Sequence, residues 1–238
     1  SFVNYSAYAR GTLILIRKGV KHHILHAVDN SQGGYNIVRV VVEGCPFTLI
    51  NSYGPSVDDS DFFWKVWRAC PIHTRGGVLW GGDFILLLDK HLDCSNPNRT
   101  LHTQATKVVQ DIMATQELLD LWRCRYPTGR KGTYVAAAHG TWARLDYWLA
   151  MGGMGSWVHR VRHLPRTLSD HSPVLLTLRP PGVEHKLYTW RMPSHALSDD
   201  TLHGEILTDI QTYFDINAKS VDSYGVVWEA FKAYIHGA

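Results

Sequence analysis

The amino-acid sequence predicts an α/β domain followed by a helical appendage. Short runs rich in β-branched and aromatic residues alternate with longer segments in which apolar residues recur at helical spacing. This pattern breaks at Pro180-Pro181-Gly182, where the charge also reverses. Residues 1–182 carry 20 Lys and Arg against 13 Asp and Glu, whereas residues 183–238 carry 4 against 8. We therefore expect one domain over residues 1–180 and a helical segment over residues 181–238.

The expected strands are apolar runs bounded by turn residues. Residues 12–16, 37–42 and 46–50 predict antiparallel strands of one sheet. Further strands are expected at residues 78–80, 133–135, 143–149 and 174–176. In the segment 143–149, the alternation puts Asp146 on the opposite face from Leu145 and Tyr147.

Helices are expected in both parts of the chain. The acidic sequence Asp58-Asp59-Ser60-Asp61 precedes apolar residues at helical spacing over residues 62–70, and its negative charge suits the amino-terminal end of a helix dipole. Residues 106–119 repeat this spacing. Beyond the boundary, Ser198-Asp199-Asp200 can cap an amphipathic helix that continues to Tyr213, and a second amphipathic helix follows Ser223.

Composition excludes several classes of protein. A chain of 238 residues with 45% hydrophobic and 19% charged side chains is long enough to bury a sizeable core. The four cysteines form no Cys-x-x-Cys pair, so we expect a reduced, intracellular protein without a zinc site or a disulfide framework. No apolar run exceeds strand length, so no membrane partner is expected. The sequence also lacks the glycine-rich loops that serve nucleotide hydrolysis or hydride transfer.

Several short motifs follow one another in a set order. They are Arg10-Gly11-Thr12-Leu13-Ile14-Leu15, Asn51-Ser52-Tyr53-Gly54-Pro55, Gly81-Gly82-Asp83-Phe84, Asp120-Leu121-Trp122-Arg123, Gly132-Thr133-Tyr134, Arg144-Leu145-Asp146-Tyr147 and Ser169-Asp170-His171-Ser172-Pro173. In this order and spacing the chain resembles the endonuclease/exonuclease/phosphatase superfamily. Within it, the chain resembles the endonuclease domain of LINE-type retrotransposons, relatives of the apurinic/apyrimidinic (AP) endonucleases. The resemblance runs from about Arg10 to Arg179 and continues through Trp190-Arg191 and the helix around Trp228-Glu229-Ala230-Phe231-Lys232. It implies a four-layer α/β sandwich of two mixed β-sheets flanked by helices.

The resemblance also implies the chemistry of the site. Phosphodiester hydrolysis needs a cation for the phosphate, a group that orients the water, and a donor for the developing charge. By correspondence of motifs, Asp170 would be a ligand of Mg²⁺ or Mn²⁺, and Asp83 would position the attacking water. His171 would contact the scissile phosphate, Asp146 would orient His171, and Tyr53 would supply a hydroxyl group to the phosphate. We expect Asp83, Asp146, Asp170 and His171 to converge in one cleft, with Asp146 within hydrogen-bonding reach of His171.

DNA is the expected partner. Thr133 and Ser169 match positions that the retrotransposon endonucleases use around the DNA contact. Positive charge is concentrated between Leu121 and Arg166, where Asp146 is the single acid, and such a stretch attracts a polyanion. We assign three of its arginines to DNA binding, namely Arg123, Arg130 and Arg144. A solvated basic face is the alternative interpretation.

Other interpretations of the motifs stay open to different degrees. Asp83 could cap the next segment, and Asp146 could be an ordinary ion-pair partner. A serine hydrolase built on Ser169-Asp170-His171 is disfavoured, because adjacent residues of an extended stretch point to opposite faces. The Gly-x-Ser-x-Gly sequence of such enzymes is also missing.

Two departures from the family pattern bear on activity. Where the family has asparagine two residues after the aspartate of Gly-Gly-Asp-Phe, this chain has Ile85, which cannot hydrogen-bond through its side chain. The family also has an asparagine and a metal-binding glutamate upstream of Arg10, so we expect an amino-terminally truncated domain. At its other end the chain would lead into a reverse transcriptase region of a longer polyprotein.

These observations predict a degenerate, Mg²⁺-dependent DNA endonuclease-like domain that is weakly active or inactive. It would be intracellular, and nuclear if the full element is expressed. Two alternatives remain, a nucleic-acid-binding relic without catalysis and a phosphatase of the same superfamily.

Overall fold

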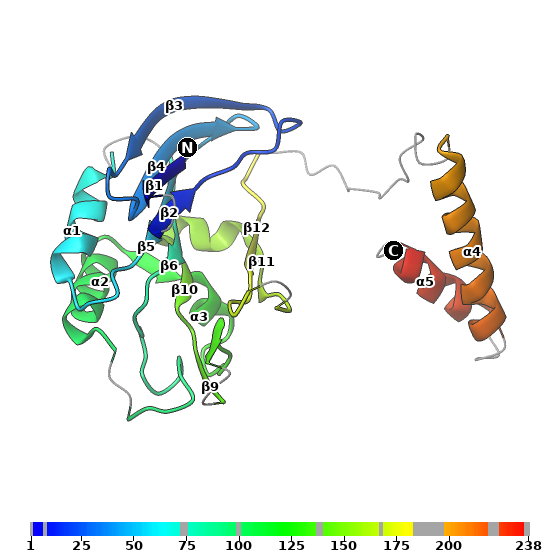
Figure 1. Ribbon diagram of the computed structural model, residues 1–238. Helices are drawn as coiled ribbons and strands as arrows, with labels where there is room; N and C mark the ends of the chain where they lie inside the picture. Colours follow the sequence, from blue (N-terminus) through cyan, green and yellow to red (C-terminus); the bar gives the residue numbers. More distant parts are fainter. Residues whose placement is uncertain are drawn as a thin grey trace. The chain divides into compact units, whose positions relative to one another are not determined.

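The computed structural model describes residues 2–6, 9–71, 76–98, 101–136, 140–166, 169–182, 198–218 and 224–235. The chain divides into two compact units, Ser1–Glu184 and His185–Ala238 (Figure 1). Trp190-Arg191, which the sequence analysis included in the family resemblance, lies outside the described residues. Among the described helices, none has both the length and the apolar character needed to cross a bilayer.

Unit 1 is built on a six-stranded mixed sheet with the strand order β3-β4-β5-β6-β10-β7. Its strands are β3 (His22–Asp29), β4 (Tyr35–Val42), β5 (Cys45–Tyr53), β6 (Gly77–Asp83), β7 (Leu118–Asp120) and β10 (Asp146–Met151). Only β5 and β6 pair in parallel within this sheet, and α1 (Ser60–Ala69) connects them. The other neighbouring pairs are antiparallel.

One face of this sheet packs against helices. Helices α1 and α2 (Thr103–Thr115) contact each other on the same side of the sheet (Figure 1). Helix α1 begins after Asp59, whose carboxylate accepts a hydrogen bond from the Phe62 amide at 3.2 Å. Its apolar residues Phe63 and Trp67 are buried against Trp80 of β6, with ring centroids 6.2 and 5.8 Å from that of Trp80. The acidic start and the helical spacing of this segment were therefore interpreted correctly.

The other face carries a second, smaller β layer. It contains the ribbon β1 (Phe2–Ser6) with β2 (Ala9–Leu13) and the ribbon β11 (Val158–His163) with β12 (Val174–Leu178). Val40 and Leu79 of the large sheet share a core with Leu176 and Leu178 of β12. The 3₁₀ helix η2 (Gly152–Trp157), the short helix α3 (Leu121–Arg125) and the hairpin β8 (Tyr134–Ala136) with β9 (Thr141–Ala143) complete unit 1. The α/β fold class is thus confirmed, with the second sheet formed by ribbons over the described residues.

Several element boundaries differ from the sequence prediction. The helix expected over 106–119 ends at Thr115, because Glu117 has a positive φ of 53° and the chain then enters β7. The strand expected over 143–149 is interrupted, since Arg144 and Leu145 lie between β9 and β10. Strands β3 and β11 were not predicted, because histidine and arginine residues break their apolar patterns.

The described residues of unit 2 form two helices, α4 (Asp200–Asn217) and α5 (Tyr224–Ile235). Both were predicted, and the Asp199 carboxylate caps α4 by accepting hydrogen bonds from the amides of Thr201 and Leu202. The two helices pack through aromatic rings. The ring centroid of Phe231 on α5 lies 5.4 Å from that of Tyr213 and 4.9 Å from that of Phe214 on α4.

Candidate active site

Three neighbouring strands of the large sheet bring candidate site residues to one edge. Asp83 is the last residue of β6, and Asp146 is the first residue of β10. These two residues are register partners across the antiparallel pair. On the other side of β6, Asp83 is the register partner of Tyr53, the last residue of β5. Pairing of strands thus sets Tyr53, Asp83 and Asp146 side by side, although they are far apart in sequence.

The glycine before Asp83 allows this close approach of β5 and β6. Gly82 has a φ of 141°, a conformation that side chains other than glycine rarely adopt. A Cβ atom there would lie 1.9 Å from the Ser52 carbonyl oxygen of β5. Glycine is therefore needed in the motif for its backbone conformation, which places Asp83 at the end of β6.

His171 completes the cluster from a different segment. It follows the turn at Ser169 and Asp170 and makes an isolated antiparallel bridge with Tyr134, whose ring centroid lies 5.1 Å away. Its Nδ1 lies 2.8 Å from Oδ2 of Asp146. Because a carboxylate can only accept, Nδ1 donates and Nε2 is left facing Asp83, whose Oδ2 is 3.9 Å away. The prediction that Asp146 lies within hydrogen-bonding reach of His171 is confirmed.

The proximity of these groups changes their proton affinities. Burial and the neighbouring Asp146 carboxylate raise the pKa of Asp83 to about 6, against partial compensation by His171. The hydrogen bond to Asp146 raises the pKa of His171 above its ordinary value. Asp83 therefore changes its charge close to neutral pH, where a group that accepts and returns protons is most useful.

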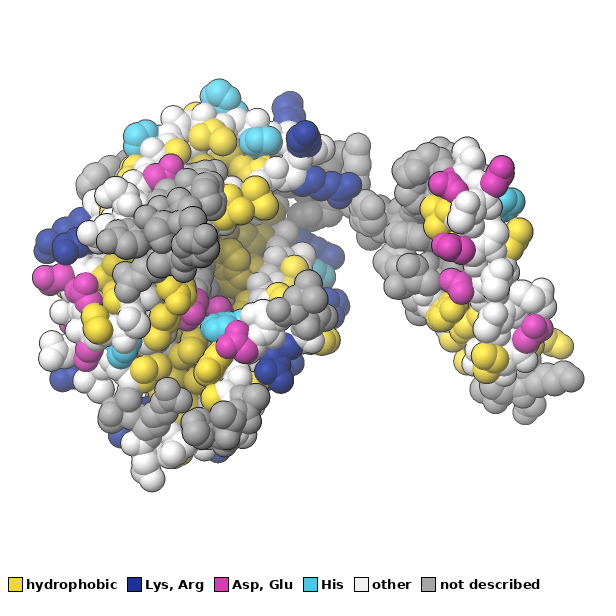
Figure 2. Space-filling model, in the orientation of Figure 1, with side chains coloured by type: hydrophobic (Ala, Val, Ile, Leu, Met, Phe, Trp, Pro, Cys, Tyr) yellow, Lys and Arg dark blue, Asp and Glu magenta, His cyan; other side chains and the backbone are white. Residues whose placement is uncertain are grey.

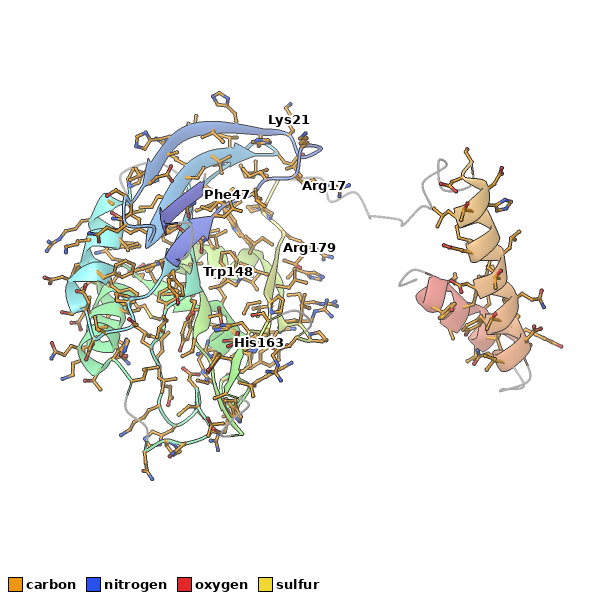
Figure 3. All side chains as sticks on the ribbon, in the orientation of Figure 1. Arg17, Lys21, Phe47, Trp148, His163 and Arg179 are labelled. Atoms are coloured by element: carbon orange, nitrogen blue, oxygen red, sulfur yellow. The ribbon has the colours of Figure 1, made fainter. Side chains whose placement is uncertain are left out.

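A cavity opens beside this cluster. It has a volume of about 300 Å³, and Asp146, His171, Ser169 and Trp148 are among its lining residues. Trp148 lies on β10 and donates from Nε1 to the Val174 carbonyl of β12 at 3.0 Å (Figure 3). Figure 2 shows a hollow on this face of unit 1, lined with hydrophobic side chains and with histidine and acidic side chains at its margin. A ligand can thus reach the cluster from solvent.

The donor atoms of the cluster suit a hard divalent cation. Asp83, Asp146 and His171 each offer one ligand atom within 4.8 Å of the others. Because Nδ1 of His171 donates to Asp146, Nε2 is its free nitrogen, and the other two donors are carboxylate oxygens, which are the ligands that Mg²⁺ and Mn²⁺ prefer. Asp170 is exposed and outside this group of three, but its charge contributes to the raised pKa of Asp83.

Ile85 occupies a strained position next to the cluster. Its φ is 51°, in the left-handed region that is unfavourable for a β-branched residue. Its amide donates to Oδ1 of Asp83 at 3.1 Å. The backbone at this position thus has the conformation that asparagine and glycine adopt most easily, while the side chain is an isoleucine. The sequence revealed the chemical mismatch but not this conformation.

Two arginines assigned to DNA binding form ion pairs within the protein, and the burial of Arg144 contradicts its assignment, whereas that of Arg123, which is 19% exposed, stays a prediction. Arg144 is only 1% exposed and forms ion pairs with Asp93 at 2.8 Å and Asp120 at 2.6 Å. The Arg123 guanidinium pairs with Asp93 at 2.5 Å and donates to the carbonyls of the turn that follows α3. Their sequence neighbourhood is basic, but acids 24 or more positions away neutralise them.

Of the remaining residues predicted to contact the phosphate or DNA, some lie in the interior and others at the surface. Thr133 is fully buried, so its assignment to the DNA contact was wrong. Ser169 is exposed, and its hydroxyl accepts from the His171 amide at 3.0 Å. Arg130 is exposed, although one nitrogen donates to the Cys94 carbonyl. Tyr53 is 36% exposed at the end of β5. Their predicted contacts with the phosphate or with DNA remain predictions.

Comparison with known proteins identifies the fold. No family model matches the sequence. A 3′-5′ exonuclease from Neisseria meningitidis aligns with a TM-score of 0.51 and 20% identity, over 68% of this chain and 71% of its own. An AP endonuclease from Leishmania major aligns with a TM-score of 0.53 and 16% identity, over 64% and 56%. The Neisseria protein is also known as a 3′ phosphatase bound to a product DNA hairpin, with a TM-score of 0.52 and 19% identity over 66% and 71%. The chain therefore has the fold of the AP endonucleases and of this exonuclease/phosphatase.

Proposed function

We propose that unit 1 is a divalent-metal-dependent phosphodiesterase-type domain that nicks DNA, and that its turnover is slow. The observation that carries this proposal is the Asp146–His171 hydrogen bond next to Asp83, at the open edge of the large sheet. A carboxylate that fixes one imidazole nitrogen leaves the other free to interact with a substrate oxygen. A pKa near 6 suits Asp83 to accept a proton from water.

Each residue would have a distinct role in the reaction. Asp146 holds the orientation of His171 and favours its protonated form, in which Nε2 donates to an oxygen of the scissile phosphate. Asp83 in its ionised form orients the attacking water and takes up its proton as the water oxygen bonds to phosphorus, while the P–O bond opposite the water breaks and the sugar oxygen leaves. Tyr53 supplies a phenolic donor from the end of β5. A bound Mg²⁺ or Mn²⁺, held by carboxylates including Asp170, would neutralise phosphate charge.

The wider context is also a proposal. We infer that residues 1–180 form the endonuclease domain of a LINE-type retrotransposon and that residues 181–238 form its helical linker. A reverse transcriptase region would then be a partner in the same polyprotein, and the nucleus would be the site of action. The ordered sequence motifs support this origin.

Two alternatives have specific support. Ile85 favours a nucleic-acid-binding relic, because an apolar and strained residue stands beside the group that would position the water. A phosphatase of the same superfamily is favoured by the likeness to the Neisseria 3′ phosphatase.

An oligonucleotide panel distinguishes these three functions. Three duplexes are incubated with Mg²⁺ or with EDTA: an intact duplex, one with an abasic site, and one with a 3′-phosphate end. Strand cleavage that requires Mg²⁺ and disappears in His171→Ala supports the nuclease. Release of phosphate alone supports the phosphatase, and binding without any reaction supports the relic.

A further inference from the structure

Thr133 lies where three segments of the candidate site meet. Its side chain is fully buried just before β8. Its amide donates to the Ala143 carbonyl at 2.9 Å, which closes the β8–β9 hairpin. Its carbonyl accepts from the Ser172 amide at 2.6 Å, immediately after His171. The main chain of Thr133 thus joins the hairpin to the segment that carries the histidine.

The hydroxyl group of Thr133 binds the start of β10. Its oxygen accepts hydrogen bonds from the amides of Leu145 at 3.0 Å and Asp146 at 3.1 Å, which uses both lone pairs. The carbonyl of Leu145 accepts in turn from the Phe84 amide at 2.8 Å, next to Asp83. One buried oxygen therefore fixes the backbone of Asp146 at the point where the chain turns into the strand.

We propose that Thr133 positions Asp146 and, through Asp146, the ring of His171. This inference rests on the proposed function of the site, for which the 2.8 Å contact between Asp146 and His171 is the central feature. A displacement of about 1 Å within a reacting constellation can lower a rate by about 10²-fold. Thr133 touches neither substrate nor metal in this scheme, so it is a positioning residue.

Different substitutions at Thr133 separate the effect of its hydrogen bonds from the effect of its packing. Valine has nearly the shape of threonine but no acceptor, so Thr133→Val leaves two buried amides without their partner. Serine keeps the acceptor and loses only a methyl group. Thr48→Val provides a matched control, because Thr48 is also buried, at 4% exposure, but lies near the start of β5 rather than at the site.

The test is the ¹H–¹⁵N spectrum of the histidine rings in the full chain at one fixed pH. Hydrogen bonding to Asp146 gives the His171 Nδ1–H a downfield signal, which is assigned by its loss in His171→Gln. We expect the signal to be unchanged in Thr133→Ser and Thr48→Val, and shifted or lost by exchange in folded Thr133→Val. A folded Thr133→Val protein with an unchanged signal would overturn the proposal.

A second measurement needs no destabilising variant. In the unmodified protein, the amides of Leu145 and Asp146 should exchange with deuterium slowly, and they should stay protected in Thr133→Ser. Exchange as fast as that of exposed amides would contradict the proposed hydrogen bonds. Both readouts are independent of DNA cleavage. If the protein is inactive but gives the expected spectra, the proposed DNA cleavage is wrong, while the positioning of Asp146 and His171 by Thr133 stands.

Discussion

Asp83 and Asp146 are register partners across β6 and β10, so two carboxylates face each other at the edge of the sheet. Like charges in this relation destabilise a sheet. Here the cost is reflected in the raised pKa of Asp83, of which burial is the larger cause. The ionised site therefore destabilises the folded state. Favourable interactions elsewhere in the fold offset this cost, as they do for many functional sites.

The first prediction is that Asp83→Asn stabilises the fold while it removes activity. Because the folded pKa of about 6 lies above the unfolded value of 3.8, ionisation of Asp83 opposes folding. The loss of stability caused by ionised Asp83 is absent below about pH 4 and reaches its full value above about pH 6 to 7. We expect a gain on the order of 1–2 kcal/mol in the free energy of unfolding at pH 7.5, measured by urea denaturation. Exposed Asp111→Asn is the control, and an equal gain at pH 4 would contradict the explanation.

The second prediction concerns the conformation of Ile85. Asparagine tolerates the left-handed region better than isoleucine does, so Ile85→Asn should raise the free energy of unfolding by about 1 kcal/mol. Ile85→Val keeps the β-branched, apolar character and should give no gain. Thermal denaturation of the three proteins measures the difference. If asparagine and valine had the same effect, backbone strain would not be the reason.

The third prediction is acid sensitivity caused by His163. This residue lies at the end of β11, is 5% exposed, and stacks on Trp122 at 4.8 Å (Figure 3). Burial, together with the positive charges of Arg144 and Lys131, lowers its pKa to about 4, against an opposite effect of Asp146. Stability from the neutral ring is therefore fully present above about pH 6.5 and is lost as the pH falls toward 4.

Replacement by phenylalanine keeps the stacking and removes the charge. We expect unmodified protein to lose up to about 3 kcal/mol more stability than His163→Phe between pH 7 and pH 4. Exposed His26→Phe on β3 controls for the loss of a histidine. Parallel stability curves for His163→Phe and the unmodified protein would show that His163 does not titrate in this way.

The fourth prediction separates structural arginines from those available to DNA. Arg144→Met removes the arginine partner of Asp120 and one of the two arginines that pair with buried Asp93, and it should cost about 3–5 kcal/mol of stability. Arg160 and Arg162 on β11 are exposed, and among the described residues no acid pairs with them. Their joint replacement by glutamine should weaken DNA binding, measured by fluorescence anisotropy.

The salt dependence of that binding identifies its origin. Loss of two phosphate contacts should reduce the slope of log affinity against log salt by about 2. Replacement of Lys65 and Lys107 on the helical face by glutamine is the matched control and should leave the slope unchanged. Binding that does not respond to salt would exclude an electrostatic surface.

The sequence predicted the polar residues of the site better than their surroundings. Asp83 and His171 could be found because they lie beside apolar runs within ordered motifs, and Asp146 because the alternation over residues 143–149 puts it opposite Leu145 and Tyr147. The burial of Arg144 could not be found, because its partners Asp93 and Asp120 come from segments that only the fold brings together. The interior position of Thr133 and the left-handed backbone of Ile85 likewise depend on tertiary structure, which a local pattern does not encode.

Nicking of supercoiled plasmid by the unmodified chain tests whether the Asp83, Asp146 and His171 cluster cleaves DNA. With Mg²⁺ and excess protein, we expect slow conversion to the open circle, and none in EDTA or in His171→Ala. The rate should be low because loss of one stabilising donor costs on the order of 10²–10³ in rate. Nicking that persists in His171→Ala would contradict the assignment of the site, and rapid nicking by the unmodified chain would show that Ile85 does not limit it.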